Sequence, residues 1–136
     1  MSGADRGGWA LLGLDHVQLA APEGAEPLLR AFYADVLGMT ELPKPPVLAA
    51  RGGCWFAAGD VVLHLGVEAP FRPARKAHPG IRAAGLDALA GCLAAAGVPV
   101  TWDDALPGQR RFYAEDPVGN RLEFLEPLAG PAPGRP

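Results

Sequence analysis

Hydrophobic and polar residues alternate in several short runs of this chain, and alternation with a period of two predicts β-strands. In residues 61–67 one face of the predicted strand is apolar, formed by Val61, Leu63, Leu65 and Val67. His64 lies on the opposite face. Residues 14–20 form a similar predicted strand, in which His16 and Gln18 lie opposite Val17 and Leu19. Both strands therefore place histidine away from the face expected to enter the core.

The last part of the chain predicts a β-hairpin over residues 110–126. Its two strands are joined by Asp116-Pro-Val-Gly119, where proline at the second position and glycine at the fourth favour a type I turn. In the returning strand, Leu122 and Phe124 share one face and Glu123 lies on the other. A carboxylate held in the middle of a strand needs a cation, a metal or water beside it.

Two segments have apolar residues at helical spacing, and each is followed by a glycine that suits a helix C-terminus. They are residues 26–37, before Gly38, and residues 86–96, before Gly97. Weaker patterns predict short strands over residues 39–42, 47–50, 54–58, 78–83 and 98–102. We also expect Trp9 to anchor the N-terminal lead-in by packing on the domain.

These elements describe an internal repeat of one strand, one helix and three strands, offset by roughly 60 residues. The sequence therefore predicts an α+β fold in which two βαβββ modules form curved mixed sheets around a concave cup. We expect a single domain over residues 1–136, with module one at about 12–69 and module two at about 77–127. Residues 1–10 and 128–136 are expected to be flexible tails.

Four polar residues occupy equivalent places in the repeat. His16 and His78 lie on the first strand of each module, His64 and Glu123 lie on the last strand, and all four are opposite the apolar stripe. Imidazole and carboxylate ligands suit a divalent ion of Mn, Fe, Ni or Zn. The alternative is that each histidine is a hydrogen-bonded structural residue and Glu123 a solvated carboxylate.

Composition and charge narrow the class of protein. The 136 residues are 49% hydrophobic and carry a net charge of −3 without a basic stripe, which argues against nucleic acid as a partner. No apolar run approaches the ~18 residues of a membrane span, and the N-terminus lacks a signal-peptide pattern, so a cytoplasmic location is expected. We expect Cys54 and Cys92 to be free buried thiols.

The motifs around these residues resemble the vicinal oxygen chelate superfamily, which includes glyoxalases, fosfomycin-resistance thiol transferases, extradiol dioxygenases and bleomycin-binding proteins. The resemblance covers roughly residues 14–127, and its clearest pieces are residues 14–17, 32–38 and 116–123. It implies a metal in the cup, held by His16, His78 and Glu123 with His64 at the remaining place. It also implies that Glu123 or a metal-bound hydroxide is the catalytic base.

The function implied by this resemblance is that of a glyoxalase-like metal-dependent enzyme, which acts on a small, anionic oxygenated molecule by bidentate chelation to the metal. Glyoxalases usually have a carboxylate where this chain has His64, which weakens the isomerase or lyase assignment. The His, His, Glu trio is more similar to that of the thiol transferases, and dioxygenases rank third. The alternative is a metal-free protein that binds or sequesters a small molecule or drug, of the bleomycin-resistance type.

Substrate binding is assigned to Gln18, Arg75, Arg82, Arg111 and Tyr113. We expect Arg75, Lys76 and Arg82 near the mouth of the cup, where they would favour an anionic substrate; the alternative is a solvated rim. A single module leaves its cup and edge strands open. Together with the resemblance, this predicts a homodimer whose site combines His16 and His64 of one chain with His78 and Glu123 of the other.

Overall fold

The computed structural model describes residues 7–128 and has the predicted α+β architecture of two βαβββ modules, each with its own four-stranded mixed sheet. The first sheet has the order β1-β4-β3-β2, with β1 at Val17–Ala21, β2 at Thr40–Leu42, β3 at Cys54–Ala58 and β4 at Val61–Val67. The second has the order β5-β8-β7-β6, with β5 at Gly80–Arg82, β6 at Thr101–Asp103, β7 at Gln109–Glu115 and β8 at Arg121–Pro127. In each sheet the first strand pairs parallel with the last, and the other pairs are antiparallel.

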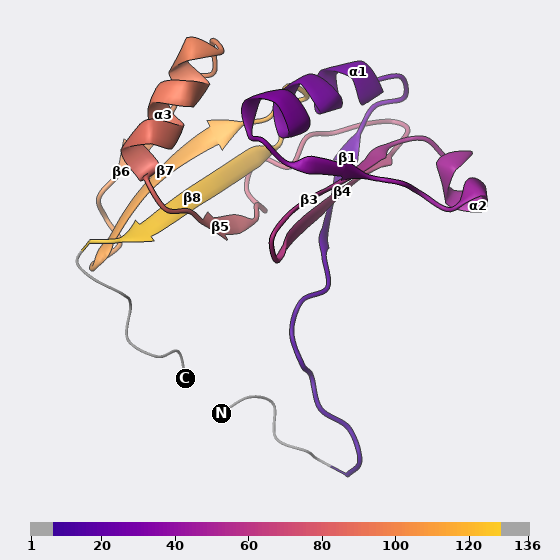
Figure 1. Ribbon diagram of the computed structural model, residues 1–136, viewed down its shortest axis with the longest axis horizontal. Coiled ribbons are helices and arrows are strands. Elements are labelled where there is room, and N and C mark those ends of the chain that lie inside the picture. Colours follow the sequence, from indigo (N-terminus) through magenta and orange to yellow (C-terminus); the bar gives the residue numbers. More distant parts are fainter. Residues whose placement is uncertain (1–6, 129–136) are drawn as a thin grey trace.

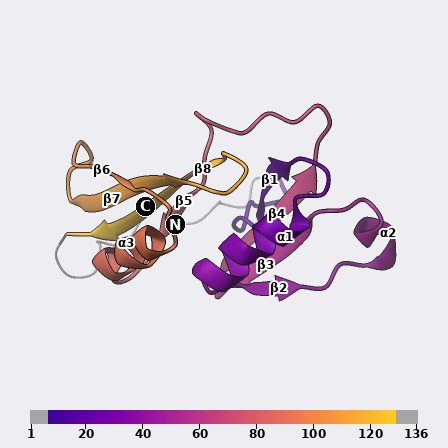
Figure 2. The same ribbon diagram turned by 90° about the horizontal axis from the view of Figure 1, so that it is seen from above.

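Helices cover one side of both sheets, as Figures 1 and 2 show. They are α1 (Glu26–Leu29) with the π-helix η1 (Arg30–Val36) in the first module, and α3 (Leu86–Ala95) in the second. The predicted helix over 26–37 is thus present, but its second half is wider than an α-helix. The amide of Leu37, for example, donates to the carbonyl of Phe32, five residues earlier, at 2.9 Å.

The core lies between the helices and the sheets and contains residues of both modules. The strand faces that turn toward the helices supply Leu63 and Leu65 from β4, and Leu122 and Phe124 from β8. These are the residues that the alternating pattern assigned to the core. The opposite sheet faces, which carry the polar residues of the repeat, are therefore free to form a site.

A buried polar network joins the modules at the Asp116–Gly119 turn. The amide of Gly119 donates to the carbonyl of Asp116 at 3.0 Å, as expected for the predicted turn. Asp116 also accepts a hydrogen bond at 2.7 Å from the hydroxyl of Tyr33 in η1. The side chain of Asn120 donates to the carbonyl of Ala20 at 2.8 Å and accepts from the amide of Ala74 at 2.9 Å. The turn thus fixes one module against the other and against the connector between them, residues 70–77.

Three expectations from the sequence are wrong. Residues 47–50 are not a strand, because proline favours the first turn of a helix and the segment forms α2 (Pro46–Ala49). Trp9 is 58% exposed and does not pack on the domain; it belongs to an extended arm that leads away from β1 (Figure 1). Cys92 is exposed, with its Sγ 3.5 Å from the carbonyl oxygen of Val36, whereas Cys54 is buried as expected.

The remaining expectations concern the termini and the membrane. The predicted flexible tails lie largely outside the described residues, which begin at 7 and end at 128. No helix within residues 7–128 is long and apolar enough to cross a membrane.

Candidate functional site

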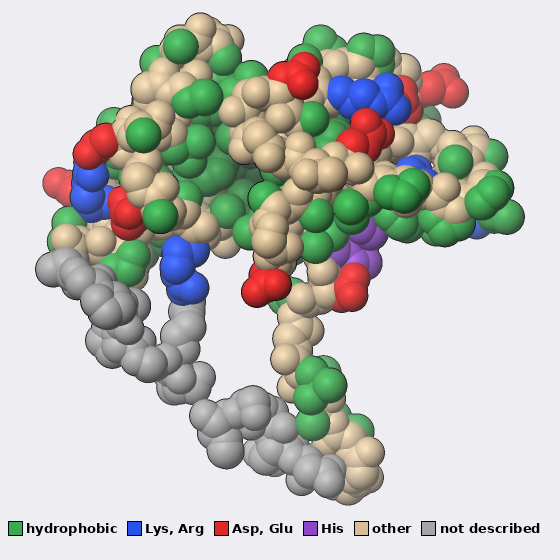
Figure 3. Space-filling model, viewed as in Figure 1, with side chains coloured by type: hydrophobic (Ala, Val, Ile, Leu, Met, Phe, Trp, Pro, Cys, Tyr) green, Lys and Arg blue, Asp and Glu red, His purple; other side chains and the backbone are tan. Residues whose placement is uncertain are grey.

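The face of the first sheet that turns away from the helices carries a row of side chains across all four strands. His64 on β4 is in register with Gln18 on β1 and with Trp55 on β3, and Trp55 is in register with Leu42 on β2. In Figure 3 histidine side chains reach the surface on the side of the sheets opposite the helices. Here the strand pairing brings together residues that the sequence could only place on a common face.

The rings of this row stack on one another. The centroids of His16 and His64 lie 3.9 Å apart with an interplanar angle of 16°, and those of His64 and Trp55 lie 4.2 Å apart at 9°. Burial and, next, the neighbouring His16 lower the pKa of His64, and Asp15 opposes them. His64 is therefore held as a neutral imidazole at neutral pH, the form that can bind a metal or accept a proton.

Two of the histidines have one ring nitrogen tied to an oxygen. Nδ1 of His16 lies 2.8 Å from Oδ1 of Asp15, and Nδ1 of His78 lies 2.8 Å from the carbonyl oxygen of Lys76. A carbonyl oxygen can only accept, so the Nδ1–H of His78 is the donor. In the neutral form of both residues this leaves the lone pair on Nε2, which is the arrangement that orients histidine ligands in metal sites.

The second sheet places His78 against Glu123, which is only 7% exposed on β8. Nε2 of His78 lies 2.9 Å from Oε1 of Glu123. When Nδ1 carries the proton of a neutral imidazole, these two atoms are both acceptors and repel each other. A positive centre, either a proton or a metal cation, is needed between them.

Arg111 holds the other oxygen of Glu123. Its Nη1 donates to Oε2 at 3.0 Å, and its Nη2 donates to Oδ1 of Asp103 at 3.3 Å. The hydrogen bond to Glu123 and, to a smaller extent, that to Asp103 raise the pKa of the Arg111 guanidinium, and burial opposes them. The Nε of Arg111 is buried without a hydrogen-bond partner among the described residues. Arg111 was predicted to bind substrate, but its guanidinium is occupied by the two carboxylates.

The other predicted substrate residues take different positions. Gln18 is exposed beside His64, and its amide lies over Gly66, where an added Cβ would come within 2.7 Å of Nε2. The ring of Tyr113 meets His78 edge-on, with centroids 5.6 Å apart. Arg82 is exposed on β5, on the same face as Glu123, and Arg75 is exposed in the connector.

These side chains form two half-sites within one chain. One contains His16 and His64, and the other contains His78 and Glu123. Within residues 7–128 of a single chain, no three His, Cys, Asp or Glu side chains lie close enough together to hold a metal ion. The donor set itself fits a divalent cation, because imidazole and carboxylate groups are ligands of such ions and two of the rings have Nδ1 beside an oxygen acceptor, so that their neutral forms present Nε2.

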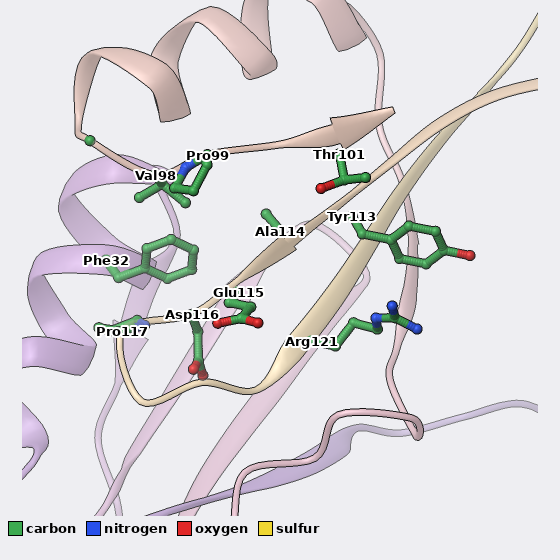
Figure 4. A pocket seen from close by; sticks show the side chains of 11 residues that line it. Phe32, Val98, Pro99, Thr101, Tyr113, Ala114, Glu115, Asp116, Pro117 and Arg121 are labelled. Carbon is green, nitrogen blue, oxygen red and sulfur yellow. The ribbon is translucent and has the colours of Figure 1, made fainter. Parts of the chain in front are cut away.

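Two cavities lie beside the half-sites. One, of about 780 Å³, runs along the first sheet from His16 and His64 to the segment that carries Lys44 and Arg51. The sequence pattern predicted a strand over residues 47–50 of this segment and did not single out either cation. The other, of about 490 Å³, extends from Phe32 to Tyr113 and Arg121 and contains none of the predicted metal ligands (Figure 4).

Known structures with this architecture support the assignment of the fold. A Bacillus anthracis protein assigned to the glyoxalase family is 48% identical, with a TM-score of 0.84, over 86% of this chain and 96% of that one. A lactoylglutathione lyase from Agrobacterium tumefaciens is 25% identical, with a TM-score of 0.64, over 84% of this chain and 92% of that one. A fosfomycin resistance protein from Listeria monocytogenes is 15% identical, with a TM-score of 0.68, over 85% and 93% respectively.

No family model matches the sequence, and no curated protein is significantly similar to it. The identity to the Bacillus anthracis protein extends over nearly all of that chain, and the motifs that suggested the superfamily lie at the start of β1, at η1 and at the turn that leads into β8. The chain belongs to the glyoxalase family of the vicinal oxygen chelate superfamily.

Proposed function

We propose that this protein is a glyoxalase-like enzyme that holds a divalent metal between two chains and acts on a small, anionic molecule with two neighbouring oxygens. The observation that carries the proposal is the contact of 2.9 Å between Nε2 of His78 and Oε1 of Glu123. Since Nδ1 of His78 donates to a backbone carbonyl, either a proton or a metal cation is needed between the two facing atoms, and we assign a metal cation to this position. A metal bound there would supply Lewis acidity toward the two oxygens of the substrate.

The protein's own residues divide the work. His16 and His64 of one chain would complete the ligand set of His78 and Glu123 of another, because each half-site alone has too few donors. Arg111 fixes Oε2 of Glu123 and so orients Oε1 toward the ligand position. We assign the proton acceptor of the reaction to Glu123, and assign Tyr113 and Gln18 to the walls that orient the substrate.

The reaction class follows from the position of His64. Glyoxalases usually have a carboxylate there, whereas this chain offers an imidazole that is neutral at pH 7 because its pKa is lowered. An isomerase or lyase reaction would then depend on Glu123 alone as the carboxylate base. A thiol transferase reaction, which needs the metal to activate the substrate and a thiol from solution, places no such demand on His64.

A metal-free binding protein of the bleomycin-resistance type is the second candidate, and one observation favours it. Both oxygens of Glu123 already have partners in His78 and Arg111, so a protonated His78 satisfies the carboxylate without a metal. In that case the cup would hold its ligand by shape, stacking and charge.

Metal content decides between the two candidates. We expect protein purified without chelator to contain about one divalent ion per chain, and His78→Ala and Glu123→Gln to lose it, because each removes one of about four ligands. Glu115→Gln is the matched control, since Glu115 is exposed on the neighbouring strand and should leave metal content unchanged. Metal-free protein that takes up no ion of Mn, Fe, Ni or Zn would refute the enzyme.

Mixing inactive chains tests whether the site is shared. His16→Ala and Glu123→Ala chains each lose both sites of their own dimer, but a mixed dimer would contain one intact site and one without either residue. We therefore expect about half of the wild-type metal per mixed dimer. A monomer by light scattering, or no recovery of binding after mixing, would rule out sites between chains.

A further inference from the structure

The cavity on the first sheet extends well beyond the two histidines. It is lined by His16, His64 and Gln18, and also by Leu48, Arg51 and Gly52 from the segment between β2 and β3. Neighbouring strands lie about 4.8 Å apart, so the row from His64 across Trp55 to Leu42 spans roughly 10 Å. A ligand that is chelated near His64 therefore has a lined channel of that length beside it.

The wall of the cavity that the segment between β2 and β3 forms is positively charged. Lys44 donates to the carbonyl of Gly52, and its ammonium lies 5.8 Å from the centroid of the Trp55 ring. Arg51 is exposed and lines the cavity, and its guanidinium forms no hydrogen bond or ion pair with any residue in the range 7–128. Lys44 is thus fixed by the backbone, while the five donors of Arg51 are available to a ligand.

The acidic groups near the cavity are already occupied. Asp15 is bound to Nδ1 of His16, and Glu26 accepts the amide of Gly53 at 2.7 Å. The hydrogen bond from the Gly53 amide is the main reason that the pKa of Glu26 is lowered, and it ties the end of the cationic segment to α1. The segment is therefore held in place at its base, and Arg51 has no acidic partner that competes with an anion.

We propose that Arg51, supported by Lys44, is the specificity-determining residue for an anionic group at the far end of the substrate. The substrate would carry two neighbouring oxygens at one end and a carboxylate or phosphate some 6–8 Å away, with a flat or apolar middle part against Trp55 and Leu42. This inference rests on the proposed function, because it takes the chelated end of the substrate to lie at the histidines.

Two isosteric probes test the inference with the manganese-loaded protein. The probes are 3,4-dihydroxybenzoate and 3,4-dihydroxybenzamide, which share two neighbouring oxygens and differ in the charge of the distant group. Calorimetry would give the ratio of their Kd values in wild type, in Arg51→Gln and in the control Arg72→Gln, an exposed connector arginine outside the cavity. Comparing ratios cancels the effect of the substituent on the acidity of the catechol.

We expect wild type and Arg72→Gln to prefer the benzoate by about fivefold to tenfold, and Arg51→Gln to reduce that preference to about twofold or less. Equal binding of both probes by wild type, or an unchanged preference in Arg51→Gln, would overturn the role of Arg51 and leave the chelating site intact. Failure of both probes to bind protein that has taken up manganese would instead overturn the proposed chelation, and this inference with it.

Discussion

Removal of the Tyr33 hydroxyl should measure how strongly the two modules are fastened together. The side chain is fully buried, and its hydroxyl donates to Oδ2 of Asp116 at 2.7 Å. Burial and, next, the Asp116 carboxylate raise the pKa of Tyr33 well above its ordinary value, so the phenol remains a donor. Asp116 itself is 4% exposed, and the other hydrogen bonds of its carboxylate come from Val118 and Asn120 within its own turn.

In Tyr33→Phe, Oδ2 of Asp116 keeps only its bond from Asn120, and its burial leaves little access for water. A hydrogen bond to a charged group contributes about 1.5–3 kcal/mol, so we expect a loss of about 2 kcal/mol in the free energy of unfolding. For a domain of this size that corresponds to a decrease in Tm of roughly 6–10 °C.

Urea unfolding followed by tryptophan fluorescence would measure the change, with all variants at one protein concentration because dimer formation would add to apparent stability. Tyr113→Phe is the matched control: Tyr113 is half-buried, its hydroxyl has no hydrogen-bond partner in the range 7–128, and its loss should cost less than about 0.5 kcal/mol. A double-mutant cycle of Tyr33→Phe with Asp116→Asn should give a coupling of at least about 1 kcal/mol. If Tyr33→Phe unfolds at the same urea concentration as Tyr113→Phe, the contact between modules does not stabilise the fold.

Three further predictions concern the backbone, the thiols and pH. Gly53→Ala should lower the free energy of unfolding by at least about 2 kcal/mol, because Gly53 has φ +86° and an added Cβ would collide with the carbonyl of Leu65. Gly91→Ala in the middle of α3 meets no neighbouring atom and should stabilise the fold by about 0.5–1 kcal/mol. Urea midpoints that rank the two variants the other way would contradict this. With DTNB at about pH 8 we expect only Cys92 to react in the native protein, because burial raises the pKa of the Cys54 thiol to about 11. Cys92→Ser should then abolish the reaction, and fast labelling of that variant would show that Cys54 is accessible. Since the pKa of His64 is lowered from 6.5, the unfolded chain binds more protons at this residue than the folded chain does. The stability that the neutral ring contributes is therefore present above about pH 6.5 and decreases as pH falls through the folded pKa. His64→Gln should reduce the difference between the urea midpoints at about pH 7.5 and 5.5, and an unchanged difference would contradict the assignment.

Much of the fold was predictable because the strands alternate strictly. The parity of Val61–Val67 and of residues 122–124 correctly placed His64 and Glu123 on the faces opposite the core. The two helical segments were found from their apolar spacing, but spacing over two turns does not separate an α-helix from the π-helix at Arg30–Val36, which differ in hydrogen-bond register. Residues 47–50 were misassigned because four residues carry too little periodicity to outweigh apolar composition.

The site was less predictable, because side-chain partners depend on register between strands. Sequence could place Arg111 near Glu123 on one hairpin, but the pairing of Tyr113 with Glu123 decides that the guanidinium reaches Oε2. The role of Asp15 as the partner of His16 is local and could have been suspected from adjacency alone. Arg51 gave no signal, because its place beside the histidines results from how the segment between β2 and β3 folds back.

The strand pairing has a consequence for how the chain folds. Each parallel closure joins strands of the same module, Val17 with Leu63 and Gly80 with Glu123, and no ladder among residues 7–128 crosses the connector. The chain entropy lost on closing each sheet is therefore set by the length of a module and not by that of the whole chain. The shared core and the Tyr33–Asp116 hydrogen bond join two sheets that each close within their own module. We therefore expect these contacts between modules to form after the rate-limiting step. Tyr33→Phe should then accelerate unfolding while leaving the refolding rate nearly unchanged.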